Sequence, residues 1–239
     1  MLLLLSAAPG AWGQDQSVRP GINKAFENPD VADYIKRFEN EDREVFVQRA
    51  VITAALNLRP GVAIADIGAG TGLFTRLFAD QVGPSGKVYA VDIAQPFLDH
   101  IAAEAKRRGQ SQVQTVRGQP DSVSLPPDSI DLAFLCDTYH HLEYPAKTLA
   151  SLHRALRPLG MIVVVEFDRR EGTSSAFVLE HVRADKKTIL AEIEDAGFER
   201  VESGMKPELK ENFFARFRKK PLPLPSPQSL PAAQGGEAR

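Results

Sequence analysis

Two acidic residues and a run of alternating glycines have the spacing that most clearly predicts ligand chemistry in this chain. Asp66 ends a short aliphatic run, and Gly68, Gly70 and Gly72 follow it before helical spacing resumes at Leu73. Glycines in such a turn permit positive φ and let backbone N–H groups approach a ligand, while a helix N-terminus favours partial negative charge. This order of strand, turn and helix predicts a nucleotide-binding site.

The positions of the glycines and acids narrow the choice of nucleotide. Counted from Gly68, the dinucleotide pattern G-x-G-x-x-G fails because position 73 is Leu, and the third glycine falls at Gly72. A carboxylate at Asp66 suits a ligand with a positive group, such as an ammonium, better than it suits a pyrophosphate. Asp92 ends the next aliphatic run at the distance where a carboxylate can accept hydrogen bonds from ribose hydroxyls. Together these residues predict a nucleoside attached to a cationic amino-acid group.

A second group of side chains that could do chemistry follows the aliphatic run at 129–136. Asp137, Tyr139, His140 and His141 come directly after it, and open α/β sheets bind ligands beyond the carboxyl ends of their strands. We interpret His140 as a general base, with Asp137 and Tyr139 beside it, because the unperturbed pKa of histidine lies near neutrality. The alternative is that both histidines only cap the turn or contact solvent. No metal site is predicted, since adjacent side chains diverge and no further ligand cluster is evident.

These side chains need a scaffold that brings the ends of several strands together. Aliphatic runs alternate with stretches of helical spacing, which indicates a parallel sheet covered by helices on both faces. The expected fold class is therefore α/β, a Rossmann-like, doubly wound and mostly parallel sheet of seven strands that ends in an antiparallel pair. The predicted strands are 62–66, 87–92, 112–117, 129–137, 161–167, 198–203 and 212–218; the predicted helices are 44–58, one that begins at Leu73, 97–105, 145–157 with a stop at 158–160, and 184–196.

Turn-forming residues and changes in composition divide the chain into four parts. The segment before the first strand mixes turn residues with aromatics and charges, which is typical of an arm or lid. Its Tyr34 and Phe38 either pack on the domain or cover the bound ligand. The last segment is rich in Pro, Gln, Ser, Gly and Ala and lacks periodicity, which predicts disorder. The four parts are a signal-like or disordered N-terminus (1–16), the arm with its helix (17–60), the nucleotide-binding domain (61–218) and the tail (219–239).

Composition excludes several classes of function. The chain has 239 residues, of which 43% are hydrophobic and 25% charged, as in an ordinary soluble globular protein. A formal net charge of −2 gives no electrostatic case for binding nucleic acid, which usually shows as a basic excess. Cys136 is the single cysteine, so an internal disulfide framework and a cysteine-cluster metal site are excluded. Because it sits in an apolar run, we expect it to be inert.

The N-terminus resembles the end of a secretory signal. An apolar start is followed by small residues, and Ala11-Trp12-Gly13 is close to an A-x-A cleavage site. The pattern predicts an exported chain, periplasmic or secreted, although the usual basic region is missing; the alternative is a cytoplasmic chain. The apolar segment is too short to span a bilayer, so no transmembrane segment is expected in the mature chain.

The stretch 62–167 resembles the class I S-adenosylmethionine-dependent methyltransferase domain, and most of all its small-molecule branch of ubiquinone/menaquinone-biosynthesis-type and arsenite-type enzymes. The resemblance implies S-adenosylmethionine as cofactor, with the glycine turn against its methionine and ribose portions, Asp92 on the ribose hydroxyls and Ile93 beside the adenine. It also implies in-line methyl transfer to a small-molecule acceptor. The cofactor-binding residues expected on this basis are Asp66, Gly68, Ala69, Gly70, Thr71, Gly72, Asp92, Ile93, Gly118, Gln119 and Asp137.

The chain also departs from this family's patterns. Gln119 stands where many relatives carry an acid for the adenine amino group, and an amide can still meet that edge. No Asn-Pro-Pro-Tyr or Asp-Pro-Pro-Tyr sequence follows the fourth strand, and Cys136 is not preceded by proline, which disfavours the amino-methylating and cytosine-C5-methylating nucleic-acid enzymes. The three cysteines of an arsenite enzyme are missing, which removes arsenic as a substrate. The alternative function is that of a catalytically inactive S-adenosylmethionine-binding sensor or assembly protein.

Overall fold

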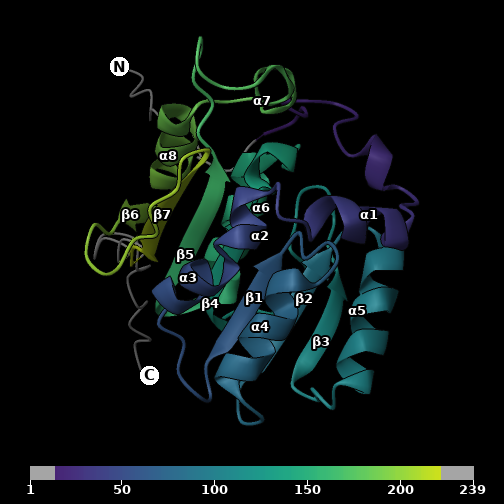
Figure 1. Ribbon diagram of the computed structural model, residues 1–239. Helices are drawn as coiled ribbons and strands as arrows, with labels where there is room; N and C mark the ends of the chain where they lie inside the picture. The colour runs from purple at the N-terminus through teal and green to yellow at the C-terminus, as the bar shows by residue number, and fades with distance from the viewer. Residues whose placement is uncertain (1–13, 222–239) are drawn as a thin grey trace, which may run out of the picture.

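A computed structural model describes residues 14–221 of the chain (Figure 1). The signal-like N-terminus, apart from residues 14–16, and the predicted tail after residue 221 lie outside the described residues. No helix in the described part of the chain is long and apolar enough to cross a membrane.

One seven-stranded sheet forms the centre of the molecule, in the strand order β3-β2-β1-β4-β5-β7-β6. Neighbouring strands are parallel from β3 to β5, while β7 runs antiparallel to both β5 and β6. The expected fold class, with its antiparallel C-terminal pair, is confirmed. The strands are β1 (Ala63–Ile67), β2 (Lys87–Asp92), β3 (Val113–Arg117), β4 (Ile130–Cys136), β5 (Leu156–Phe167), β6 (Phe198–Arg200) and β7 (Asn212–Lys219).

Helices cover both faces of the sheet because alternate side chains of each strand point to opposite faces. In β1, Ile64 packs into one buried cluster with α3 and α4, while Ala65 and Ile67 pack into another with α6 and α8. Figure 1 shows α3 and α4 in front of the sheet and α6 and α8 behind it. These helices, with α5, are α3 (Arg49–Ala55), α4 (Leu73–Val82), α5 (Gln95–Arg107), α6 (Pro145–Ala155) and α8 (Lys186–Asp195).

The strand order reverses between β1 and β4, since β2 and β3 lie on one side of β1 and β4 and β5 on the other. Open α/β sheets bind their ligands at such a reversal, beyond the carboxyl ends of the strands. Figure 1 shows the arm above this edge of the sheet, with η1 (Lys24–Phe26) and α1 (Val31–Phe38) near the top of α5. The fold therefore places the arm over the ends of the strands that carry the predicted site.

Three predicted element boundaries are wrong, and one of them is the strand expected at 198–203, which ends at Arg200. The single helix at 44–58 is two short helices, α2 (Glu44–Val47) and α3, because Gln48 leaves the helical region. The side chain of Glu44 accepts hydrogen bonds from the backbone N–H groups of Glu211 and Asn212, each at 2.9 Å. This contact ties the first short helix to the start of β7.

The predicted stop at 158–160 lies inside β5 instead of before it. The pairing of β5 with β4 shifts register between Ile130 and Leu132, and Leu159 adopts a positive φ of 64°. The residues of the predicted turn therefore form an irregular part of the strand. A short helix that sequence periodicity did not indicate, α7 (Ala176–His181), follows β5.

Candidate active site

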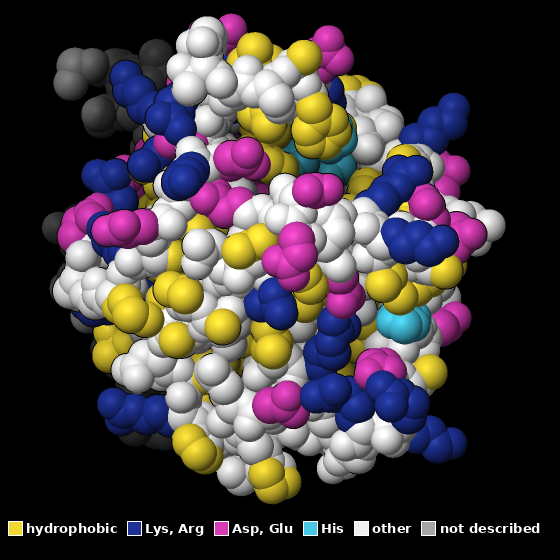
Figure 2. Space-filling view, viewed as in Figure 1, with side chains coloured by type: hydrophobic (Ala, Val, Ile, Leu, Met, Phe, Trp, Pro, Cys, Tyr) yellow, Lys and Arg dark blue, Asp and Glu magenta, His cyan; other side chains and the backbone are white. Residues whose placement is uncertain are grey.

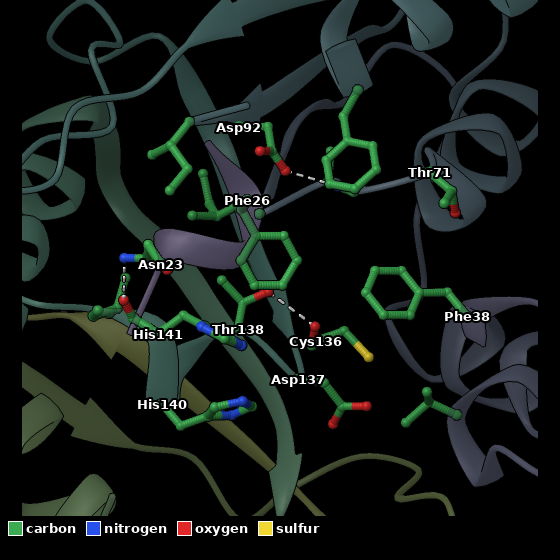
Figure 3. Close-up of a pocket in the computed structure, with 18 of the residues that line it drawn as sticks. Asn23, Phe26, Phe38, Thr71, Asp92, Cys136, Asp137, Thr138, His140 and His141 are labelled. Carbon is green, nitrogen blue, oxygen red and sulfur yellow. Dashed lines mark hydrogen bonds between the residues drawn. The ribbon is translucent and has the colours of Figure 1, made fainter. Parts of the chain in front are cut away.

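A cavity of about 640 Å³ lies at the reversal of strand order, between the carboxyl edge of the sheet and the arm. Its volume falls in the range of about 300–1,000 Å³ that is usual for small-molecule sites. Figure 3 shows Asp92 and Phe38 on one side of it and His140 and His141 on the other. On the molecular surface, histidine atoms are visible in a recess among hydrophobic side chains (Figure 2).

The glycine turn after β1 borders the cavity and adopts positive φ at all three glycines, 69° at Gly68, 52° at Gly70 and 77° at Gly72. A Cβ atom at Gly68 would lie 2.4 Å from Thr138 Cγ2, and one at Gly72 would lie 2.7 Å from Ile101 Cγ1. Both positions therefore need glycine for close packing. At Gly70 the nearest atom to a Cβ would be in the ring of Phe38, at 3.5 Å, which is an ordinary contact distance.

Asp92, at the end of β2, holds this turn in place. Its Oδ2 accepts a hydrogen bond from the Gly70 N–H and its Oδ1 accepts one from the Ala94 N–H, each at 2.8 Å. Burial raises the pKa of this carboxyl. Because an ionised carboxylate has about four acceptor positions, Asp92 keeps acceptor capacity for hydroxyl groups of a ligand in the cavity that it lines.

Asp66, at the end of β1, is a second buried carboxylate beside Asp92. The Thr75 hydroxyl donates a hydrogen bond to Asp66 Oδ2 at 2.6 Å. Desolvation by burial, with a contribution from the charge of Asp92, raises the pKa of Asp66 to about 7. Two buried acids without a described cation between them are costly when ionised, and a ligand with a positive group would relieve that cost. The predicted cationic ligand therefore fits the residues present.

Five further residues of the predicted cofactor set also line the cavity: Ala69, Thr71, Ile93, Gly118 and Gln119. One prediction needs correction. Gly72 does not line the cavity; it is the N-cap residue of α4 and packs toward Ile101. The Thr71 hydroxyl donates to Glu39 Oε1 of the arm at 2.7 Å, and Glu39 is also ion-paired with Arg76. Thr71 thus fastens the arm to the glycine turn.

The arm covers the cavity with aromatic side chains. Tyr34 lies with its ring centroid 5.1 Å from that of Phe38 and 5.4 Å from that of Phe97 on α5, and Phe26 contacts Tyr34 at 5.3 Å. All four rings line the cavity. Tyr34 and Phe38 therefore pack on the domain, as the first interpretation expected, and they also form a wall of the cavity.

Asp137 lies at the carboxyl end of β4 and lines the cavity, as expected. Its Oδ2 forms an ion pair with Arg43 of the arm, and its Oδ1 accepts a hydrogen bond from Asn212 Nδ2 at 2.6 Å. Burial raises the pKa of Asp137, although the charge of Arg43 opposes the shift. Arg43 and Asn212 were not predicted, because they come from the arm and from β7, far away in the sequence.

His140 lies in the short helix η2 (Tyr139–His141) with only 2% of its surface exposed. Its Nδ1 lies 2.9 Å from Glu166 Oε1, and Glu166 also accepts hydrogen bonds from the backbone N–H groups of His140 and Phe167. Because a carboxylate accepts hydrogen bonds, this contact places the proton on Nδ1 and leaves the lone pair on Nε2. Glu166 therefore orients the imidazole that the sequence singled out.

Tyr139, predicted beside His140 in the chemistry, is a core residue. It is fully buried, does not line the cavity, and its hydroxyl donates to Glu192 Oε2 at 2.8 Å. Burial and the charge of Glu192 raise its pKa well above the ordinary value. Burial likewise raises the pKa of the Cys136 thiol, although this cysteine is only partly buried and borders the cavity.

His141 and His181 complete a group of three imidazoles at one end of the cavity. The Nε2 atoms of His141 and His181 lie 3.3 Å apart. The ring centroid of His140 lies 4.3 Å from the centroid of His141 and 5.0 Å from that of His181. Desolvation lowers the pKa of His141 to about 2 and also lowers the pKa of His181, so both rings are neutral near pH 7. The expectation that no further ligand lies near His140 and His141 is wrong, because α7 supplies His181.

Comparison with known proteins agrees with this geometry. Residues 65–164 match a family described as a methyltransferase domain. The chain is 28% identical to the ubiquinone/menaquinone biosynthesis C-methyltransferase UbiE of Ectopseudomonas mendocina, in an alignment 173 residues long that covers 60% of this chain and 68% of that protein. It is 26% identical to the demethylmenaquinone methyltransferase of Geobacillus stearothermophilus over 153 residues, which are 63% of this chain and 64% of that protein.

Solved structures show the same fold. A S-adenosylmethionine-dependent methyltransferase from Aquifex aeolicus superposes with a TM-score of 0.65 at 23% identity, over 80% of this chain and 98% of that one. The PH0226 protein from Pyrococcus horikoshii superposes with a TM-score of 0.61 at 18% identity, over 85% of this chain and 97% of that one.

Proposed function

The chain belongs to the class I S-adenosylmethionine-dependent methyltransferases, and we propose that its acceptor is a small molecule that binds beside His140, which takes a proton from it. The observation that carries the proposal is the set of side chains that line one cavity. Buried carboxylates that suit a cationic nucleoside lie at one end, and an imidazole oriented by Glu166 lies at the other.

The residues at the first end suit S-adenosylmethionine. Asp66 would hold the ammonium, Asp92 would accept from the ribose hydroxyls, and the backbone of the glycine turn would contact the methionine portion. Ile93 and Gln119 would border the adenine. When bound, the cofactor supplies a methyl group on a sulfonium, which is already a good leaving group. The protein must therefore align the acceptor and exclude water more than it must activate the donor.

Aromatic side chains line the cavity beside the histidines, which supports a small acceptor with a hydrophobic body. Phe26 comes from the arm, Phe167 from the end of β5, and Phe177 from α7. The curated relatives above are named for quinone biosynthesis, and an acceptor with an apolar ring would suit these walls. Such an acceptor needs a base when the atom to be methylated carries a proton.

The arm would act as the lid that this chemistry requires. It contacts the glycine turn through Glu39 and Thr71, the end of β4 through Arg43 and Asp137, and η2 through Asn23, whose side-chain amide donates to the His141 carbonyl at 3.0 Å. Contacts at both ends of the cavity let one segment enclose donor and acceptor together, which strengthens electrostatic interactions and limits hydrolysis.

The proposal is tested by incubating the purified full chain with methyl-labelled S-adenosylmethionine and a small-molecule extract. We expect label in an extracted metabolite fraction, and we expect none with Asp92→Ala, which should weaken cofactor binding. Label found only in nucleic acid or protein would overturn the small-molecule acceptor. Calorimetric binding of S-adenosylmethionine without transfer to any fraction would instead favour the inactive binding protein.

A further inference from the structure

Three of the five histidines of the chain converge at one end of the cavity. His140 and His141 come from η2 and His181 comes from the end of α7, and one ring nitrogen of each lies within 4.8 Å of the others. Figure 3 shows His140 and His141 close together on the same side of the cavity. We propose that these three imidazoles bind a divalent transition metal ion such as Zn²⁺. The proposal does not rest on the proposed function.

The spacing of the nitrogens is close to what a tetrahedral ion needs. Zinc–nitrogen bonds of about 2.0–2.1 Å at the tetrahedral angle separate two ligand nitrogens by about 3.3–3.4 Å. His141 Nε2 and His181 Nε2 are already 3.3 Å apart. The remaining separations, at most 4.8 Å, require side-chain rotations that move nitrogens by roughly 1 Å to meet the same bond lengths.

The kind of ligand selects the class of ion. Neutral imidazoles suit zinc, copper, nickel and related ions, whereas magnesium and calcium prefer oxygen ligands. Metal-binding histidines usually donate their other ring N–H to a carboxylate or a carbonyl, and His140 Nδ1 has this arrangement with Glu166 at 2.9 Å.

The surroundings of His141, the second of the three proposed ligands, add a further observation. His141 Nδ1 is buried and has no hydrogen-bond partner among the described residues, and buried polar atoms of this kind call for a partner. Coordination through Nδ1 in place of Nε2 would supply that partner. The rings of Phe26, at 5.1 Å from His141, and Phe177, at 4.9 Å from His181, cover the group with apolar surface. Such a shell limits water access around a bound ion.

Three protein ligands leave a fourth coordination position for water or another molecule, as in catalytic zinc sites. An ion in this position would occupy the Nε2 lone pair that His140 otherwise offers as a base. Metal binding and proton removal by His140 therefore exclude each other, and turnover that uses this base should fall as the ion binds.

Metal binding is tested on the full chain after removal of metals with a chelator. Calorimetric titration with Zn²⁺ should show one ion per chain, and Co²⁺ should give the visible spectrum of a four-coordinate ion. His141→Ala and His181→Ala should each lower the affinity at least about 10-fold, and Glu166→Gln should lower it by about 10- to 100-fold. His100→Ala, at a histidine of α5 outside the group, is the matched control and should bind like the wild type.

Folding of each variant is checked by circular dichroism, and His181→Gln, at the end of the short helix α7, keeps a side chain of similar size if the alanine variant does not fold. Absence of stoichiometric binding to the wild type would overturn the proposal. So would equal affinities in the wild type, the folded His181 variant and His100→Ala, because the ion would then be held elsewhere.

Discussion

Replacement of Asp66 by Asn should stabilise the ligand-free protein while it weakens cofactor binding. Asp66 is 3% exposed, and burial raises its pKa to about 7 from 3.8. Because the folded pKa lies above the unfolded one, the folded state binds more protons between these values, and stability falls as pH rises through this window. About three pKa units at 1.36 kcal/mol each correspond to a cost of roughly 4 kcal/mol at pH 8.

The same relation predicts how the effect depends on pH. At pH 5 the folded carboxyl is protonated, so the cost falls to roughly 2 kcal/mol. Asp66→Asn removes the titrating group and keeps an acceptor for the Thr75 hydroxyl. The difference in unfolding free energy between Asp66→Asn and the wild type should therefore shrink by roughly 2–3 kcal/mol from pH 8 to pH 5, a change of about 5–10 °C in Tm for a domain of this size.

Urea unfolding of both proteins at pH 5 and pH 8, followed by circular dichroism, measures this difference directly. Asp99→Asn is a suitable control, since Asp99 is exposed on α5, and its stability should stay within about 0.5 kcal/mol of the wild type at both values. Calorimetry with S-adenosylhomocysteine should show weaker binding to Asp66→Asn. An unchanged pH dependence of stability in Asp66→Asn would refute the assignment of a neutral buried carboxyl in the free protein.

Three further substitutions address the turn, the base and the core. Gly70→Val places a branched side chain at a positive φ of 52° and against Phe38, and should abolish calorimetric binding of S-adenosylmethionine; unchanged affinity would remove the turn from the site. His140→Ala should lower kcat about 10²- to 10⁴-fold with little change in cofactor affinity, and normal turnover would leave it a structural role only. Tyr139→Phe should keep the turnover of the wild type and lower the free energy of unfolding in urea by about 1 kcal/mol, because only the hydrogen bond to Glu192 is removed. A large loss of kcat would show instead that Tyr139 takes part in catalysis.

The part of the site that could be predicted from sequence is the part that is local in the chain. Asp66, the glycine turn and Asp92 lie at the ends of neighbouring parallel strands, where aliphatic runs, glycines and acids mark the strand ends directly. Gly72 failed because a glycine pattern does not say which glycines face the ligand and which pack against a helix, here against Ile101. Tyr139 failed for a similar reason, since a turn of 3₁₀ helix sends adjacent side chains in different directions.

The residues that sequence reasoning missed act across long distances in the chain. His181 lies 40 residues from His141 in a helix of six residues, too short to leave a periodic signal. Arg43 reaches Asp137 from the arm. Glu166 was not among the predicted site residues, although it lies one residue before the end of β5, the strand beside β4. Its position at a strand end was a usable signal, because parallel neighbours end at the same edge of a sheet.

This division between local and distant residues follows the two tasks of the cavity. The cofactor end is built from one strand-turn-helix unit and the strand beside it, so a family pattern can specify it. The proposed acceptor end takes side chains from the arm, η2, β5 and α7, which are connected only through the fold. Such loops and short helices can change without disturbing the sheet. The methyl donor can therefore be inferred from residues 66–92, whereas the identity of the acceptor depends on which molecules can bind beside His140, His181 and the aromatic walls.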